Sequence, residues 1–239
     1  MKKIYTTLAL ASLIVFSSCD LDLFPETGYN QGNVEVNEEA GESQYSTRED
    51  MKGLRDAIYS SWTKDIQEKG YLDWLVYAEC RDNAYGGNPG TGELMAIEAN
   101  KQDGENKNVV RDWDWYQGQV SNCNNIICNI DRIKEADPTM TDKEYREWKS
   151  EAYCWRAWNL FQMSYIWGDI PLVNTIPPAI TAENIEEVYD EYFPGRTPIA
   201  DIYAQIISEL EYACENAPDT DPANKHLFTK AFAHGMLAR

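Results

Sequence analysis

The chain has 239 residues, enough for one sizeable hydrophobic core, and 43% of them are hydrophobic and 12% aromatic, as in a folded protein. Its formal net charge of −19 argues against a nucleic-acid-binding surface, because phosphate groups bind to basic surfaces. The same charge argues against direct adsorption onto anionic lipid.

The first 19 residues have the pattern of a lipoprotein export signal. Two lysines are followed by the apolar stretch 4–16, which is too short to remain in a bilayer as a helix, and two serines precede Cys19. We therefore expect residues 1–18 to be a signal peptide and Cys19 to be the lipidated first residue of the mature protein, held in a membrane by its acyl chains. The alternative is an ordinary signal peptide that leaves a free thiol at Cys19.

Residues 19–46 are acidic and rich in glycine, asparagine and glutamate, so we expect a tether that leads to a folded domain at 47–239. Thr47 and Asp50 have the spacing of a capping box at the start of the first predicted helix. The apolar residues that follow at helical spacing are Met51, Leu54, Ile58 and Trp62.

The segment 70–102 breaks this helical rhythm, and the glycines and proline at 86–92 exclude a regular helix, so a long loop is predicted. The segment mixes aromatic rings with carboxylate, amide and guanidinium groups. This mixture suits sugars, because their apolar C–H faces stack on aromatic rings and their hydroxyls hydrogen-bond to polar groups. The alternative is a solvated loop with its aromatic residues tucked against the protein body. The candidate ligand-binding residues are Trp74, Arg81, Asp82, Asn83, Tyr85 and Asn88.

A second helix is predicted from about residue 113 to a position before Pro138, because its apolar residues recur in alternating steps of three and four. Trp115 lies off this apolar stripe and is expected to be freer than its neighbours. The stripe consists of Trp113, Tyr116, Val120, Cys123, Ile127 and Ile130.

A third helix is predicted from Thr141 or Asp142 to Gly168. Between residues 152 and 167 its only charge is Arg156, so the helix should be buried on nearly every side, with Arg156 in a packing role. The aromatic residues of this stretch fit a core better than a sugar-binding platform, and they are Trp155, Trp158, Phe161, Tyr165 and Trp167.

Prolines after residue 170 predict an extended segment. Thr197 and Pro198 then fit the N-cap and first position of a fourth helix that closes near Pro218. A last helix is expected from about residue 228 and still runs at Arg239, so we expect the domain to be incomplete at its C-terminus. Small residues should pack this helix closely on the one before it; they are Ala231, Ala233 and Gly235.

Five cysteines remain besides Cys19, and neither histidine lies near them at a metal-ligand spacing. Four of these cysteines fall inside apolar helical patterns, where we expect them to act as small core residues, while a disulfide in this exported protein stays an open alternative. The chain has no nucleophile motif or phosphate-binding glycine loop, so no catalysis, metal or cofactor is expected. The five cysteines are Cys80, Cys123, Cys128, Cys154 and Cys214.

Three blocks of the sequence resemble the SusD/RagB family of surface nutrient-binding lipoproteins. Cys19 followed by LDLFP at 21–25 is similar to the short opening motif of the family. EAYCWRA at 151–157 and YIWGDIPL at 165–172 resemble its E-A-x-x-x-R-A helix and F-G-D-V-P-L turn. The third block is RTP at 196–198 with IYAQIISELEYA at 202–213 and the helix that follows.

This resemblance implies an all-α, SusD-like fold with tetratricopeptide-like helix pairs and long irregular loops. It also implies a non-catalytic protein, displayed at the surface of the outer membrane, that binds glycans and delivers them to a SusC-like TonB-dependent transporter. The alternatives are a tetratricopeptide-like scaffold that binds only proteins, a peptide-binding member of the family, and a lipid-anchored glycosidase.

Overall fold

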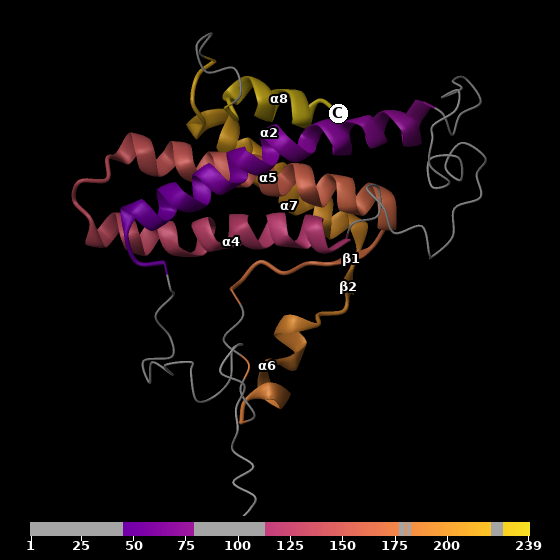
Figure 1. The fold of residues 1–239 in the computed structure, drawn as a ribbon, viewed down its shortest axis with the longest axis horizontal. Coiled ribbons are helices and arrows are strands. Elements are labelled where there is room, and N and C mark those ends of the chain that lie inside the picture. Colours follow the sequence, from indigo (N-terminus) through magenta and orange to yellow (C-terminus); the bar gives the residue numbers. More distant parts are fainter. Residues whose placement is uncertain (1–44, 79–112, 177–179, 181–182, 221–226) are drawn as a thin grey trace, which may run out of the picture. The chain divides into compact units, whose positions relative to one another are not determined.

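The computed structural model describes residues 45–78, 113–176, 180, 183–220 and 227–239 (Figure 1). The described part of the chain is all-α, as predicted, apart from one short antiparallel ladder that pairs Ile170 with Thr197 and Pro171 with Arg196. The elements in chain order are α2 (Arg48–Ala78), α4 (Trp113–Ala136), α5 (Asp142–Trp167), β1 (Ile170–Pro171), α6 (Ile185–Tyr192), β2 (Arg196–Thr197), α7 (Ile199–Asn216) and α8 (Lys230–Leu237).

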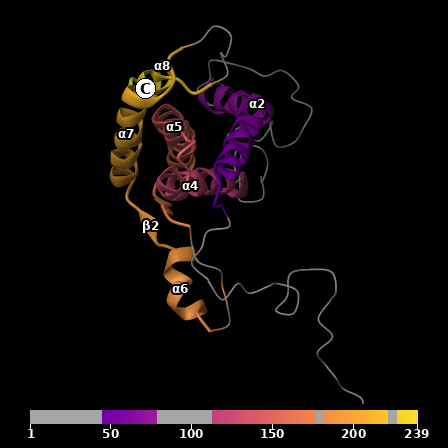
Figure 2. The same cartoon turned by 90° about the vertical axis from the view of Figure 1, so that its left-hand side faces the viewer.

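Helix α5 is the centre of a bundle that it forms with α2, α4, α7 and α8 (Figures 1 and 2). It packs most extensively on α7 and α4, and it also touches α2 and α8. The consecutive helices α4 and α5 pack on each other, as do α7 and α8. The family resemblance implied such helix pairs. A helix with an apolar face becomes stable when it buries that face against a neighbouring helix.

Local hydrogen bonds fix helix ends where the sequence predicted them. At α2, the Thr47 hydroxyl accepts from the Asp50 N–H (3.2 Å), and the Asp50 carboxylate accepts from the Thr47 N–H (2.8 Å). Thr141 and Glu144 form the same reciprocal capping box at α5. Gly168 ends α5 with a φ of 72°, a left-handed conformation that favours glycine.

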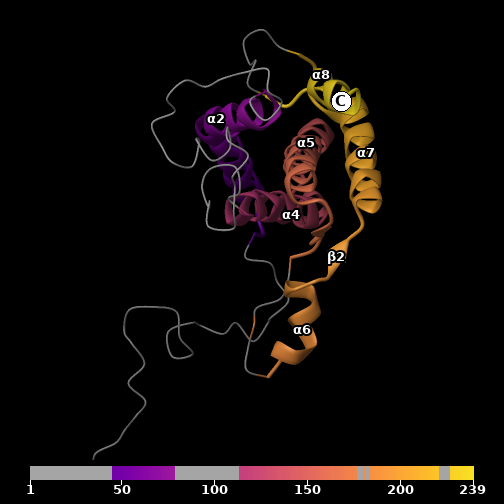
Figure 3. The same ribbon diagram turned by 90° about the vertical axis from the view of Figure 1, so that its right-hand side faces the viewer.

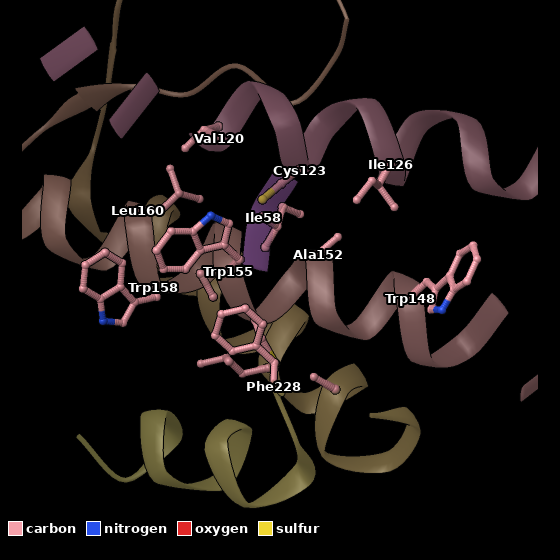
Figure 4. Packing of buried hydrophobic residues seen from close by; sticks show 14 of the residues in the cluster. Ile58, Val120, Cys123, Ile126, Trp148, Ala152, Trp155, Trp158, Leu160 and Phe228 are labelled. Carbon is pink, nitrogen blue, oxygen red and sulfur yellow. The ribbon is translucent and has the colours of Figure 1, made fainter. Parts of the chain in front are cut away.

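The core is built around the inner face of α5. Trp155 is fully buried and stacks on Trp158 with ring centroids 5.1 Å apart, and its Nε1 donates to Gln119 Oε1 at 3.1 Å. Figure 4 shows Phe228 beside these rings, with its centroid 5.7 Å from that of Trp155. The prediction of core residues is confirmed for Trp155 and Trp158, whereas Phe161 and Trp167 are only partly buried and it is wrong for Tyr165, which is 42% exposed.

The apolar stripe predicted on α4 faces this core, with one shift. Ile126 is buried, whereas Ile127 is only partly buried. Alternating steps of three and four along a helix fit either position, so the neighbouring helices decide which of the two side chains enters the core.

Helix α2 extends to Ala78, so the prediction of a single loop over residues 70–102 is wrong for residues 70–78. Gly70 lies inside the helix, where glycine costs about 1 kcal/mol relative to alanine, and a helix of 31 residues tolerates that cost. Residues 71–85 contain neither glycine nor proline, so the strong helix-breaking residues begin only at Gly86.

The stretch between α5 and α7 differs from the prediction in two ways. Helix α6 occupies residues that were expected to be extended, because the prolines at 177 and 178 restrict only their immediate neighbours. Helix α7 begins at Ile199 with Pro198 at the N-cap, and Thr197 belongs to β2. The acceptor at this helix start is Asp169 Oδ1, which receives the Ile199 N–H at 2.9 Å from 30 positions earlier in the chain.

Helix α8 begins after Thr229, whose hydroxyl accepts from the Phe232 N–H at 3.4 Å. Of the three small residues expected to pack on the preceding helix, Ala233 is buried, but Ala231 and Gly235 are exposed. The expectation was wrong for these two, because residues two positions apart do not share a helix face. Among the described helices, none has the length and apolar character needed to span a membrane.

Candidate functional site

The residues predicted to bind a ligand fall largely outside the described part of the chain. Trp74 lies in α2. The assignment of Trp74 and of the other candidates as ligand-binding residues stays a prediction, and so does the lipidation of Cys19. The residues outside the described ranges are Cys19, Arg81, Asp82, Asn83, Tyr85 and Asn88.

Aromatic residues gather where α4 begins and α5 ends, and Figure 3 shows these helices side by side. Trp113 and Trp115 lie in the first turn of α4, and Tyr165 and Trp167 in the last turn of α5; we call these four residues the aromatic end of the bundle. Trp113, Trp115 and Trp167 are half-buried, and Tyr165 is 42% exposed. Trp113 packs edge-on against Trp167 with ring centroids 5.1 Å apart. The three indoles combine packing against the core with partial access from solvent, and Tyr165 is exposed.

Trp115 packs against the core and is half-buried like Trp113, whereas Tyr116 is buried. Its ring lies edge-on to Tyr116 at 5.0 Å and to Trp155 at 6.1 Å. The expectation that Trp115 is freer therefore holds relative to Tyr116 but is wrong relative to Trp113, because an indole is long enough to reach the core from a position beside the apolar stripe.

Buried aromatic rings pack against the aromatic end on the side that faces the core. Tyr116 lies edge-on to Trp167 at 5.8 Å and stacks on Trp158 at 6.4 Å. Rings held in this way lose little conformational freedom when a ligand stacks on them. The entropic cost of binding is therefore smaller than it would be for mobile side chains. Residue 112 directly precedes Trp113, so the segment 79–112, which carries five of the candidate residues, joins the bundle at its aromatic end.

A polar groove of about 490 Å³ lies along the N-terminal half of α5, between α2 and the α7–α8 connection. A buried ion pair forms part of its lining: Arg55 Nη2 donates to Glu151 Oε1 at 2.9 Å, and Arg55 Nε donates to the second carboxylate oxygen. Burial raises the pKa of Glu151, although Arg55 opposes the shift. The described lining residues carry charges of both signs and none of them is aromatic, so they offer a sugar ring no stacking surface. The aromatic end is the better candidate for a glycan.

Arg156 holds three helices together. Its Nη2 donates to Glu209 Oε1 on α7 and its Nη1 to Asn124 Oδ1 on α4, both at 2.6 Å. Gln205 Nε2 donates to the same Glu209 oxygen at 2.8 Å. Burial raises the pKa of Glu209, while the charge of Arg156 opposes that rise. The predicted packing role of Arg156 is confirmed.

The described cysteines are free thiols. Cys123 and Cys154 are buried, which raises their pKa, as expected of core residues, but Cys128 is exposed. Cys214 Sγ lies 3.3 Å from His234 Nδ1, a contact between α7 and α8 that the sequence spacing did not reveal. Within the described ranges, no three His, Cys, Asp or Glu side chains form a group that would hold a metal ion.

Comparisons with known proteins agree on one family. The family model SusD-like_3, described as starch-binding and associating with the outer membrane, matches residues 32–239. A curated relative, SusD-like protein P2 of Formosa agariphila, is 25% identical over 202 residues, which make up 83% of this chain and 37% of the relative.

Solved structures show the same fold. Surface glycan-binding protein A from Bacteroides fluxus is similar with a TM-score of 0.61 and 19% identity over 82% of this chain and 40% of that one. A laminarin-binding SusD-like protein has a TM-score of 0.59 and 14% identity over 81% and 39%. A SusD superfamily protein from Bacteroides thetaiotaomicron has a TM-score of 0.58 and 21% identity over 82% and 44%. The chain thus spans less than half the length of these proteins.

Proposed function

Because this chain belongs to the SusD-like family of starch-binding proteins that associate with the outer membrane, we propose that it binds glycans at the bacterial cell surface. The ligand site in this proposal consists of Trp74 and the candidate residues between 81 and 88, in the segment that leads along the chain to the aromatic end of the bundle. The names of two similar proteins of solved structure, a laminarin-binding protein and a surface glycan-binding protein, support a polysaccharide as the ligand.

The aromatic end is the observation that carries this proposal. Its half-buried indoles lie where the candidate segment joins α4, so aromatic faces and polar side chains would meet a ligand from adjoining parts of the chain. Each sugar contact replaces a contact with water, so we expect dissociation constants on the order of micromolar to millimolar. Weak binding suits a protein that passes its ligand on.

The proposal includes a partner and an anchor. We infer that the protein is non-catalytic and delivers its glycan to a SusC-like TonB-dependent transporter in the outer membrane. Lipid on Cys19 would hold it there. Replacing Cys19 by alanine should then move the mature protein from the membrane fraction to the soluble fraction, and retention on the membrane after a carbonate wash would contradict the anchor.

Affinity electrophoresis in gels that contain starch or laminarin tests glycan binding. The natural full-length protein should be retarded by at least one of these polysaccharides, and Trp74→Ala or Tyr85→Ala should reduce the retardation without changing the helical circular dichroism. Tyr212→Ala is the matched control, because this half-buried tyrosine packs edge-on against Tyr153 near the opposite end of the bundle.

Two results would contradict the proposal. Unchanged retardation of both Trp74→Ala and Tyr85→Ala would move the ligand site away from residues 74–88. Release of reducing sugar from the polysaccharide would contradict the non-catalytic role.

A further inference from the structure

Helix α6 exposes an apolar face of a kind that is unusual for a short surface helix. Ile185, Tyr189 and Phe193 follow one another at intervals of four residues and are 49%, 55% and 63% exposed. Ile185 and Tyr189 lie on one face of α6 because they are four residues apart, and Phe193, which follows the last helical residue, extends this apolar stripe through its contact with Tyr189. Tyr189 and Phe193 touch, with ring centroids 5.0 Å apart. An exposed apolar stripe bordered by polar residues is typical of a protein-binding surface.

Carboxylates border this stripe. Residues 183–193 contain five acidic side chains and neither lysine nor arginine. The residues next to the stripe thus carry one sign of charge only, and a complementary partner must supply the other. The acidic residues are Glu183, Glu186, Glu187, Asp190 and Glu191.

The ladder of β1 and β2 attaches the α6 segment to the bundle. Strands β1 and β2 lead into and out of the α6 segment and pair with each other, and Asp169 links β1 to the start of α7 through the Ile199 N–H. Arg196 Nη1 also donates to the Asp169 carbonyl at 3.3 Å. Beyond this base, α6 packs extensively on none of the other described helices, and Figure 2 shows it outside the bundle, past β2. The stripe is therefore connected to the bundle through the β1–β2 ladder.

We propose that α6 is a docking helix whose apolar stripe inserts into a groove of a second protein, and that lysine and arginine border this groove. The charge decides between partners. A second copy would bring together ten carboxylates from the two 183–193 segments, on two chains of net charge −19, and anionic lipid would repel the same residues. A basic, apolar groove on another protein attracts the acidic border and covers the stripe. Resting on the function proposed above, we assign this groove to the extracellular side of the transporter.

Binding of the natural full-length protein to a SusC-like transporter of the same bacterium, purified in detergent, tests the proposal. Ile185→Ser/Tyr189→Ser should weaken the dissociation constant at least tenfold, because central apolar residues dominate such contacts. Ile207→Ser is the matched control, since Ile207 on α7 is 48% exposed, and it should change the constant less than twofold. Glu186→Lys/Asp190→Lys should also weaken binding at least tenfold, and its control is the exposed pair Glu135→Lys/Glu211→Lys.

A cross-linking experiment in the native cells identifies what covers the stripe. A photoreactive benzoylphenylalanine that replaces Tyr189 should give an adduct with an extracellular loop of the transporter. An adduct with a second copy, with the same chain or with lipid overturns the proposal, as does the absence of any adduct. Equal binding by wild type and both α6 variants, equal losses in the controls, or no binding of the wild type to the transporter also overturns it. Glycan retardation of the α6 variants is measured alongside, so failure of docking is distinguished from failure of glycan binding.

Discussion

Replacing Arg156 by methionine should destabilise the folded chain by about 3 to 5 kcal/mol. Arg156 and Glu209 are each only 6% exposed, and their 2.6 Å contact lies between α5 and α7. Methionine fills much of the space of the arginine side chain but leaves the Glu209 carboxylate buried without its cation. The loss is large because a small domain is stable by only about 5 to 15 kcal/mol.

The pH dependence separates this explanation from a simple packing defect. The charge of Arg156 lowers the pKa of Glu209 against the effect of burial, so the variant should raise that pKa further above its ordinary value. A carboxyl group with a raised pKa in the folded state stabilises the fold below its unfolded pKa, and this contribution is lost as the pH rises through the folded pKa. The destabilisation of Arg156→Met should therefore be largest near pH 7 and smaller at pH 4 to 5.

Urea unfolding followed by circular dichroism at pH 7 and pH 4.5 measures both effects. The double variant Arg156→Met/Glu209→Leu is the control, since it removes both buried charges and should recover most of the loss. A loss below about 1 kcal/mol at pH 7, or a loss that is the same at both pH values, would refute the reasoning.

Three further predictions concern stability in urea. Trp155→Ala should cost about 3 to 5 kcal/mol because the ring is fully buried, whereas Tyr165→Ala should cost much less. Hydrogen bonds from the Thr141 N–H and then from Arg48 lower the pKa of Glu144 to about 2. The contribution of Glu144 to folding stability is therefore present above pH 4.5 and is lost as the pH falls toward 2. Between pH 5 and 3, Glu144→Gln should lose less stability than the wild type. Asp169→Ala should cost about 1 kcal/mol, because the first turn of α7 loses its acceptor, and an unchanged unfolding midpoint would contradict this capping role.

Helix ends and core faces are predictable where the deciding groups are close in sequence. Thr47 caps α2 through a residue three positions away, and Gly168 ends α5 through its own backbone conformation. The burial of Trp155 follows from an almost uncharged stretch of α5, because a helix that is apolar on most sides must be buried on most sides. Such features depend on local geometry and on residue type alone.

The candidate site was predictable only as a set of residue types. The sequence identifies aromatic and polar side chains near residue 80 that suit a sugar, but Trp113 and Trp167 are 54 positions apart, and the turn between α4 and α5 brings them into contact. Trp115 likewise reaches Trp155 only because α4 and α5 pack at this point. The aromatic end is therefore a product of helix packing.

The sequence by itself determined that this chain forms helices, where most of them begin, and which faces enter the core, because periodicity and capping act over a few residues. The tertiary structure decided that Asp169 serves a helix 30 positions later and that Arg156 pairs with Glu209. It also left the apolar stripe of α6 exposed. Contacts between residues distant in the chain depend on how the helices pack, and no local pattern specifies that geometry.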